Sequence, residues 1–114
     1  MKVYLSGPMR GIEDFNREEF AKATRWLQAR GHKVFNPREM DTPDTEERYK
    51  RDPLGVAREC FLRETHYICT EAEAVVCLSG WQESRGARAE RALAEAIGLK
   101  VWYLLKLREG YDLY

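Results

Sequence analysis

The sequence has no surplus of charge of either sign. Lys and Arg together number 19, and so do Asp and Glu, which leaves a formal net charge of zero over 114 residues. Proteins that bind nucleic acid polymers need a basic surplus to displace the counterions of the phosphate backbone. The balance therefore argues against a nucleic acid polymer as partner. It still allows a small anionic ligand held by a few local arginines.

Cysteine and histidine are also scarce. The three cysteines, Cys60, Cys69 and Cys77, form no CxxC pair, and an odd, widely spaced set is typical neither of a disulfide framework nor of a zinc site. Cys77 lies in an apolar run and is expected to be a buried thiol. His32 and His66 have no partner at metal-ligand spacing, so we expect no metal.

Long apolar runs are absent. No stretch approaches the roughly 18 apolar residues that indicate a membrane span, and a strand-like segment begins directly at the N-terminus in place of a signal peptide. We therefore expect a cytoplasmic protein without membrane association.

The sequence does contain short apolar segments that alternate with amphipathic ones, over a length typical of a single domain, 1–114. Predicted strands occupy 2–7, 33–37, 74–80 and 100–105. The first predicted helix begins at a capping pattern of Asn16 and Glu19, buries Phe20, Ala23, Thr24 and Leu27, and ends at Gly31. The second begins near Arg58 with Phe61, Thr65, Ile68 and Ala72 on one stripe, and the third runs from Ser84 to Ile97 with Ala89, Leu93 and Ala96 facing inward.

This alternation predicts an α/β protein with a parallel sheet covered by helices on both faces. Right-handed crossovers leave few topologies, and we favour a small flavodoxin-like or Rossmann-like three-layer fold with a four-stranded parallel sheet in the order 2-1-3-4. Two segments lie outside this pattern. Residues 37–57 are charged and contain three prolines, which indicates a long loop that is a possible lid. The tail 106–114 is expected to dock on the body or on a partner.

The predicted strand order places a ligand crevice beyond the carboxyl ends of strands 1 and 3. Both strands end in Ser-Gly, so the loops 7–11 and 80–86 are expected to face one another there. The first loop offers Gly7, Met9, Arg10 and Gly11. Arg10 suits a phosphate or carboxylate, although a solvated loop arginine is an equally simple interpretation.

The second loop leads into a helix near Ser84, whose first N–H groups attract an anion. Gly86 and Glu90 are four residues apart, so they share a helix face and the absent side chain leaves the space above the carboxylate open. The simpler alternative is a helix-start glycine and a solvated charge. Tyr4, likewise, is explained by ordinary strand packing.

Three stretches together resemble the nucleoside 2-deoxyribosyltransferase superfamily. They read "VYLSGPMRG", "AEAVVCL" and "GWQESRGARAE". The sequence is similar to the 2'-deoxynucleoside 5'-phosphate N-hydrolases and to the small phage and bacterial proteins of the DUF4406 family, whose members show a "YLSGPMRG" strand, an "ADAIV"-like third strand and a "GW-x-x-S-x-GA-x-x-E" turn and helix. The likeness spans nearly the whole chain.

The resemblance implies an enzyme that acts on the N-glycosidic bond of a deoxynucleotide or nucleoside, as hydrolase or transferase, without a cofactor. Glu90 matches the nucleophile that attacks C1', and Tyr4 matches the tyrosine that orients it. Ser84 and Gly86 match the phosphate-binding turn, with Arg10 in the matching first loop. The superfamily further implies a homo-oligomer, at least a dimer.

One position departs from the family pattern. Glu64 stands where the superfamily usually has an Asp that engages the sugar or assists the leaving base. Either Glu64 takes over the acid role or that role is lost, and a solvated helix charge is an equally simple interpretation of Glu64. Loss of the role would fit a non-catalytic nucleotide-binding module that senses or sequesters its ligand. Trp81 is a candidate for stacking on a base at the crevice edge. Trp26 and Trp102 are expected to pack in the core.

Overall fold

A computed structural model of the protein describes residues 1–108 and 110–114. The strands are β1 (Lys2–Ser6), β2 (Lys33–Phe35), β3 (Ala74–Leu78), β4 (Lys100–Leu107) and β5 (Gly110–Leu113). The α-helices are α1 (Arg17–Ala29), α2 (Pro43–Arg51), α3 (Pro53–Thr70) and α4 (Arg85–Ala96). Three short 3₁₀ helices complete the list: η1 (Glu13–Asn16), η2 (Pro37–Met40) and η3 (Trp81–Glu83).

The five strands form one mixed sheet in the order β2-β1-β3-β4-β5. The first four are parallel, so the predicted order 2-1-3-4 is confirmed for them. The prediction of an all-parallel sheet of four strands is wrong, because β5 pairs with β4 in antiparallel orientation. The tail alternates Leu107, Tyr111 and Leu113 with polar residues, as a half-buried edge strand does, and therefore lacks the continuous apolar run of a central strand.

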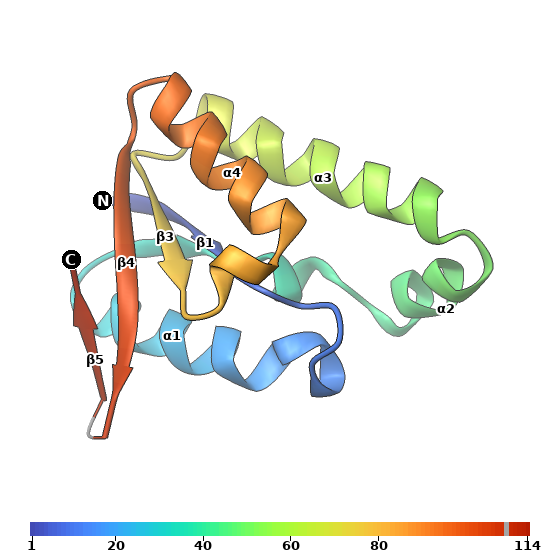
Figure 1. The fold of residues 1–114 in the computed structure, drawn as a ribbon, viewed down its shortest axis with the longest axis horizontal. Coiled ribbons are helices and arrows are strands. Elements are labelled where there is room, and N and C mark those ends of the chain that lie inside the picture. Colours follow the sequence, from blue (N-terminus) through green and yellow to red (C-terminus); the bar gives the residue numbers. More distant parts are fainter. Residues whose placement is uncertain (109) are drawn as a thin grey trace.

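Helices cover both faces of the sheet, α1 on one side and α3 with α4 on the other (Figure 1). Side chains alternate between the two faces along each strand. Val3 and Leu5 join the α1 core, whereas Tyr4 joins the core against α3 and α4. Cys77 is a buried free thiol on the α3 and α4 side.

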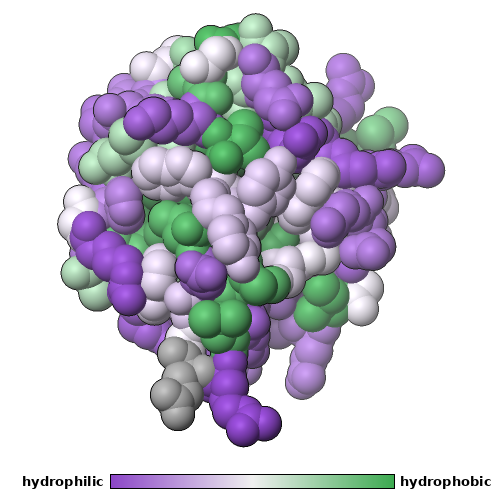
Figure 2. Space-filling model, turned by 60° about the vertical axis from the view of Figure 1, so that its left-hand side comes forward, coloured by the Kyte–Doolittle hydropathy of each residue, from purple (hydrophilic) through white to green (hydrophobic). Residues whose placement is uncertain are grey.

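The C-terminal hairpin leans on α1. The Tyr111 hydroxyl donates a 2.7 Å hydrogen bond to Glu19, which also pairs with Lys106 at 3.1 Å. Trp26 packs against Tyr111 and, with Trp102, against the α1 core, which confirms the packing expected for both tryptophans. Figure 2 shows the β4–β5 side of the molecule, where hydrophobic side chains are interspersed with charged ones.

All of residues 37–57 except 41, 42 and 52 lie in helices, so the prediction of a long loop is wrong there. The three prolines that indicated a loop each follow an N-cap residue at the start of η2, α2 or α3. Proline is tolerated at this position because its missing N–H would have no partner inside the helix. The cap side chains of Asn36, Thr42 and Asp52 accept hydrogen bonds from the backbone N–H groups of Arg38, Thr45 and Gly55. Helix α3 therefore begins at Pro53, five residues before the predicted start.

Two further details of the helices differ from the predictions. Asn16 does not cap α1 through its side chain. It lies in the left-handed region with Asp14 and Phe15, and its side chain donates to the Pro8 carbonyl at 2.9 Å.

The buried stripes of α3 and α4 are also displaced. The buried residues of α4 are Ala87, Glu90 and Ala94, whereas the prediction named Ala89 and Ala96. The buried residues of α3 are Val56, Glu64 and Ile68, whereas the prediction named Phe61 and Thr65. In both helices a buried glutamate occupies the stripe, which a purely apolar pattern does not detect. Within the described residues, no helix is long and apolar enough to cross a membrane.

Candidate active site

The turns after β1 and β3 meet at one end of the sheet, as the strand order predicts. Strands β1 and β3 pair in parallel with Ser6 opposite Cys77. A Cβ on Gly7 would lie 2.8 Å from the Leu78 Cβ, so only glycine allows the first turn to pack on the end of β3. Gly80 has a φ of +88°, and a Cβ there would lie 3.1 Å from Pro8. The two turns therefore pack directly against each other.

Strand alternation aims two hydroxyls at helix α4. Tyr4 and Ser6 are two residues apart, so both face the α4 side of β1. The Tyr4 hydroxyl donates to Oε2 of Glu90 at 2.7 Å, and the Ser6 hydroxyl donates to Oε1 at 2.7 Å. Glu90 is only 4% exposed. A buried carboxylate is costly unless hydrogen-bonded, and here each oxygen has its own donor.

Glu64 of α3 is a second buried carboxyl beside Glu90. It is 6% exposed, and burial together with the charge of Glu90 and hydrogen bonding to it raises the pKa of Glu64 to about 8. Burial also raises the pKa of Glu90, but hydrogen bonds from Ser6, Tyr4 and Glu64 oppose that effect. Since donors to Glu90 favour its charged form, the proton that the pair retains at neutral pH resides on Glu64.

The same cluster affects Tyr4. Burial and the nearby charges of Glu90 and Glu64 raise the pKa of its phenol well above the usual value. Tyr4 therefore remains a protonated hydrogen-bond donor at neutral pH. The cluster thus offers one ionised carboxylate, one protonated carboxyl and two hydroxyl donors.

A cleft of about 1190 Å³ opens above this cluster. Its walls come from the first loop, η1, α2, α3 and the start of α4. Glu64 lines the cleft, whereas the buried Glu90 and Tyr4 are not among its lining residues.

The N-terminus of α4 opens into the same cleft. The Ser84 hydroxyl accepts a 3.1 Å hydrogen bond from the Ala87 N–H and so caps the helix. The first N–H groups of a helix have no partner inside it, and Ser84 occupies only the one at Ala87. A Cβ on Gly86 would meet nothing within 4 Å. The backbone at Arg85 and Gly86 is therefore accessible to an anionic group.

A family model described as Domain of unknown function (DUF4406) matches residues 1–103. The match covers all four parallel strands up to the middle of β4 and every residue of the carboxyl cluster. The chain belongs to the DUF4406 family. The predicted membership is confirmed, while β5 lies beyond the matched residues. No curated protein matches the sequence.

The structure brings most of the predicted site residues of this DUF4406 protein together. Tyr4, Glu64 and Glu90 form the carboxyl cluster. The cleft lining contains the predicted residues Met9, Arg10, Ser84 and Gly86.

Three predicted residues lie elsewhere. Gly7 is a packing residue under the first turn, and Gly11 is an exposed turn residue with a φ of +80°. Trp81 lies outside the cleft lining, because its ring packs on Tyr103 at 5.7 Å and under the Arg91 guanidinium at 5.0 Å.

Other residues of the site were missed by the sequence reasoning. Ser6 was considered only as a strand end, although its spacing of two from Tyr4 places both on one face. Phe15 and Tyr49 line the cleft and pack edge to face at 6.1 Å. Arg38 and Asp41 also line it, from the segment that the proline pattern indicated as a loop.

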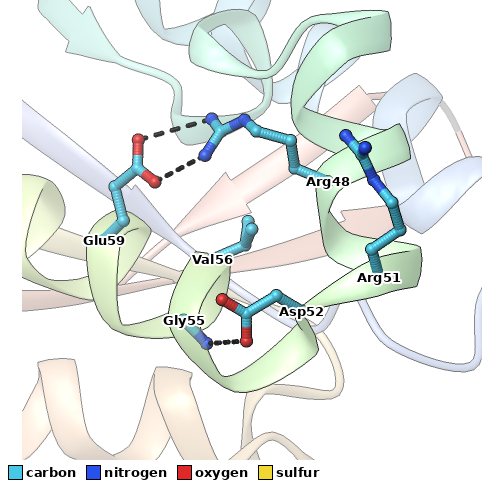
Figure 3. Close-up of a pocket in the computed structure, with 6 residues that line it drawn as sticks. All are labelled: Arg48, Arg51, Asp52, Gly55, Val56 and Glu59. Carbon is cyan, nitrogen blue, oxygen red and sulfur yellow. Dashed lines mark hydrogen bonds and ion pairs between the residues drawn. The ribbon is translucent and has the colours of Figure 1, made fainter.

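A smaller cavity of about 380 Å³ lies between α2 and α3 (Figure 3). Arg48 points across it to Glu59 and donates two hydrogen bonds, of 2.8 and 3.4 Å. Asp52 accepts from the Gly55 N–H at 3.1 Å and caps α3. These groups satisfy each other, and the cavity contains none of the predicted site residues of the DUF4406 protein.

No group of three or more His, Cys, Asp or Glu side chains is arranged to hold a metal ion among residues 1–108 and 110–114.

Proposed function

We propose that the protein cleaves the N-glycosidic bond of a deoxynucleotide or nucleoside, with Glu90 as nucleophile. One observation carries this proposal: a buried carboxylate oriented by two 2.7 Å hydroxyl hydrogen bonds stands beside a carboxyl that retains its proton. Retaining glycosidases need this combination of a nucleophilic carboxylate and a protonated acid. The resemblance to the deoxyribosyltransferase superfamily assigns the same role to Glu90 and supports the proposal independently.

The first step breaks the bond between C1' and the base nitrogen. Glu90 forms an ester bond to C1', and Glu64 transfers its proton to the leaving base. Tyr4 and Ser6 hold both oxygens of Glu90 and so orient the carboxylate for attack. In the second step water attacks C1', its proton passes to Glu64, and the Glu90 carboxylate is released. A second base in place of water would make the protein a transferase.

The α4 N-terminus supplies the anion site of the proposed substrate. A 5'-phosphate near the backbone N–H groups of Arg85 and Gly86 would hold the sugar over the carboxyl cluster. Arg10 also lines the cleft and adds a positive charge. Phe15 and Tyr49 provide aromatic surface for the base.

A panel of deoxynucleosides and their 5'-monophosphates tests the proposal, with free base measured by chromatography. We expect base release by the natural protein and none above background for Glu90→Gln. Glu64→Gln is expected to reduce release by about 10²- to 10⁴-fold, the usual contribution of a general acid. Glu95→Gln on the exposed side of α4 is the matched control and should retain full activity. Full activity of Glu90→Gln would exclude it as the nucleophile.

A second candidate is a nucleotide-binding module without catalysis. It is favoured by the burial of Glu90 and its absence from the cleft lining, since a carboxylate that never meets C1' cannot attack it. Calorimetric binding of a deoxynucleotide with no base released over days would support this candidate. Release of base that depends on Glu90 would exclude it.

A further inference from the structure

A buried ionic network leads from the cleft wall to Glu64. Asp41 follows η2, and its side chain is only 13% exposed. One of its oxygens, Oδ2, accepts a short hydrogen bond from Arg38. The other, Oδ1, lies 3.5 Å from Nη2 of Arg63. Asp41 therefore stands between two guanidinium groups.

Arg63 is shared between two carboxyls. The same Nη2 atom lies 3.5 Å from Asp41 and 3.7 Å from Oε2 of Glu64. Neither contact has hydrogen-bond geometry, since Nη2 and Nε of Arg63 and Oδ1 of Asp41 are buried without a hydrogen-bond partner among the described residues. The position of the Arg63 charge thus depends on the balance between Asp41 and Glu64.

Asp41 is itself held from the opposite side. Arg38 is 3% exposed, lies 5.5 Å from the Phe15 ring and reaches Glu46 of α2 at 3.6 Å. Glu46 in turn pairs with Arg17 of α1 at 3.0 Å. These contacts hold Asp41 in place relative to η2, α1 and α2. Arg63 is therefore attracted to a carboxylate whose position is fixed.

The charges around Glu64 come from every element packed against it. Glu90 faces it from α4, Tyr4 from β1, and Arg63 and Cys60 from α3 itself. Arg63 is the cation among these groups, and it favours the ionised form of Glu64.

We propose that Asp41 is a positioning residue for Glu64, which draws the Arg63 guanidinium toward itself and thereby leaves the acid protonated. This inference rests on the proposed function only in taking Glu64 as the acid. It assigns a role to the segment around η2, whose Asp41 would control when Glu64 carries its proton.

The test is a pH titration of Glu64 followed by NMR of protein labelled with ¹³C at the glutamate carboxyl. The signal is assigned by its absence in Glu64→Gln. In the natural protein the upper titration step of the Glu64–Glu90 pair is expected near pH 8. In Asp41→Asn, Arg63 turns fully to Glu64, and the acid dissociation constant of this step should rise about tenfold, which is one pH unit.

Arg63→Gln removes the cation and is expected to move the same step in the opposite direction, to higher pH. This variant keeps the inference falsifiable if Asp41→Asn fails to fold after losing the partner of Arg38, because Asp41 can act on Glu64 through Arg63 only if the Arg63 charge itself lowers the pKa of Glu64. Asp44→Asn is the control, because that exposed carboxylate pairs with Arg48 and has no contact with the network. An unchanged titration in Asp41→Asn, or a shift of Arg63→Gln to lower pH, would overturn the inference.

The titration needs no substrate, so it separates the two proposals. A protein that releases no base but shows the expected shifts would refute the proposed function and keep the role of Asp41. A protein that releases base through Glu90 but shows an unchanged titration would keep the proposed function and refute the role of Asp41.

Discussion

Replacing Glu64 by Gln should change how the stability of the protein depends on pH. The native pair holds a proton on Glu64 up to about pH 8, whereas an unfolded glutamate releases it near 4.5. The native state therefore binds the proton more tightly than the unfolded chain. The resulting stabilisation is complete below about pH 4.5 and is lost as the pH rises toward 8.

The magnitude follows from the size of the pKa shift. Each pH unit contributes at most about 1.4 kcal/mol for one proton, so the free energy of unfolding should fall by about 2–3 kcal/mol between pH 5.5 and 7.5. That is a large part of the roughly 5–15 kcal/mol expected for a domain of this size. The surface carboxylates with lowered pKa values, Glu18, Glu59 and Glu71, act in the opposite direction but below pH 4.5, outside this window.

In Glu64→Gln the amide can donate to Glu90 in place of the carboxyl proton, and no titrating proton remains at position 64. The variant should therefore lose this pH dependence and gain about 2–3 kcal/mol relative to the natural protein between pH 5.5 and 7.5. Urea unfolding followed by tryptophan fluorescence at several pH values measures the difference. Glu59→Gln, an exposed position on the same helix, should follow the natural protein. If the free energy of unfolding of Glu64→Gln fell with pH in parallel with that of the natural protein, Glu64 would not be the group that holds the proton.

Two other sets of variants test the geometry. Gly7→Ala should lower the free energy of unfolding in urea by about 1–3 kcal/mol, because the added Cβ meets Leu78. Gly86→Ala lies at an open position and should be neutral or slightly stabilising. Equal effects of the two substitutions would contradict the packing of the two turns. Tyr4→Phe removes a hydrogen bond that lowers the pKa of Glu90, so the low-pH limb of base release should move to higher pH as the rate falls. An unchanged profile would show that Tyr4 does not orient the nucleophile.

The parallel strands and their order were predictable because they are continuous apolar runs bounded by glycine. β5 was not, since its apolar residues alternate at an edge. Proline occurs both in loops and at the first position of helices, so the prolines at 37, 43 and 53 are compatible with either structure. The N-cap residues before them, Asn36, Thr42 and Asp52, distinguish a helix start from a loop. A capping residue before each proline was therefore the signal that was overlooked.

The carboxyl cluster was predictable in part. Glu90 and Tyr4 follow from the strand order and the helix start, and Ser6 follows from alternation once Tyr4 is placed. Burial of Glu64 was not readable from the pattern, because a charged residue on a helix is usually solvated. Asp41 was harder still, since its contacts join segments distant in sequence and depend on how α2 and α3 pack.

The most direct measurement is a search for a sugar on Glu90. A deoxynucleotide with fluorine at C2' destabilises the oxocarbenium-like transition state, which slows release of the sugar from the enzyme and lets a covalent intermediate accumulate. Mass spectrometry of the intact protein and of its peptides should then show one fluorosugar attached to the peptide that contains Glu90, and none in Glu90→Gln. Attachment to another residue, or release of base by a protein that never carries the sugar, would contradict the proposed nucleophile.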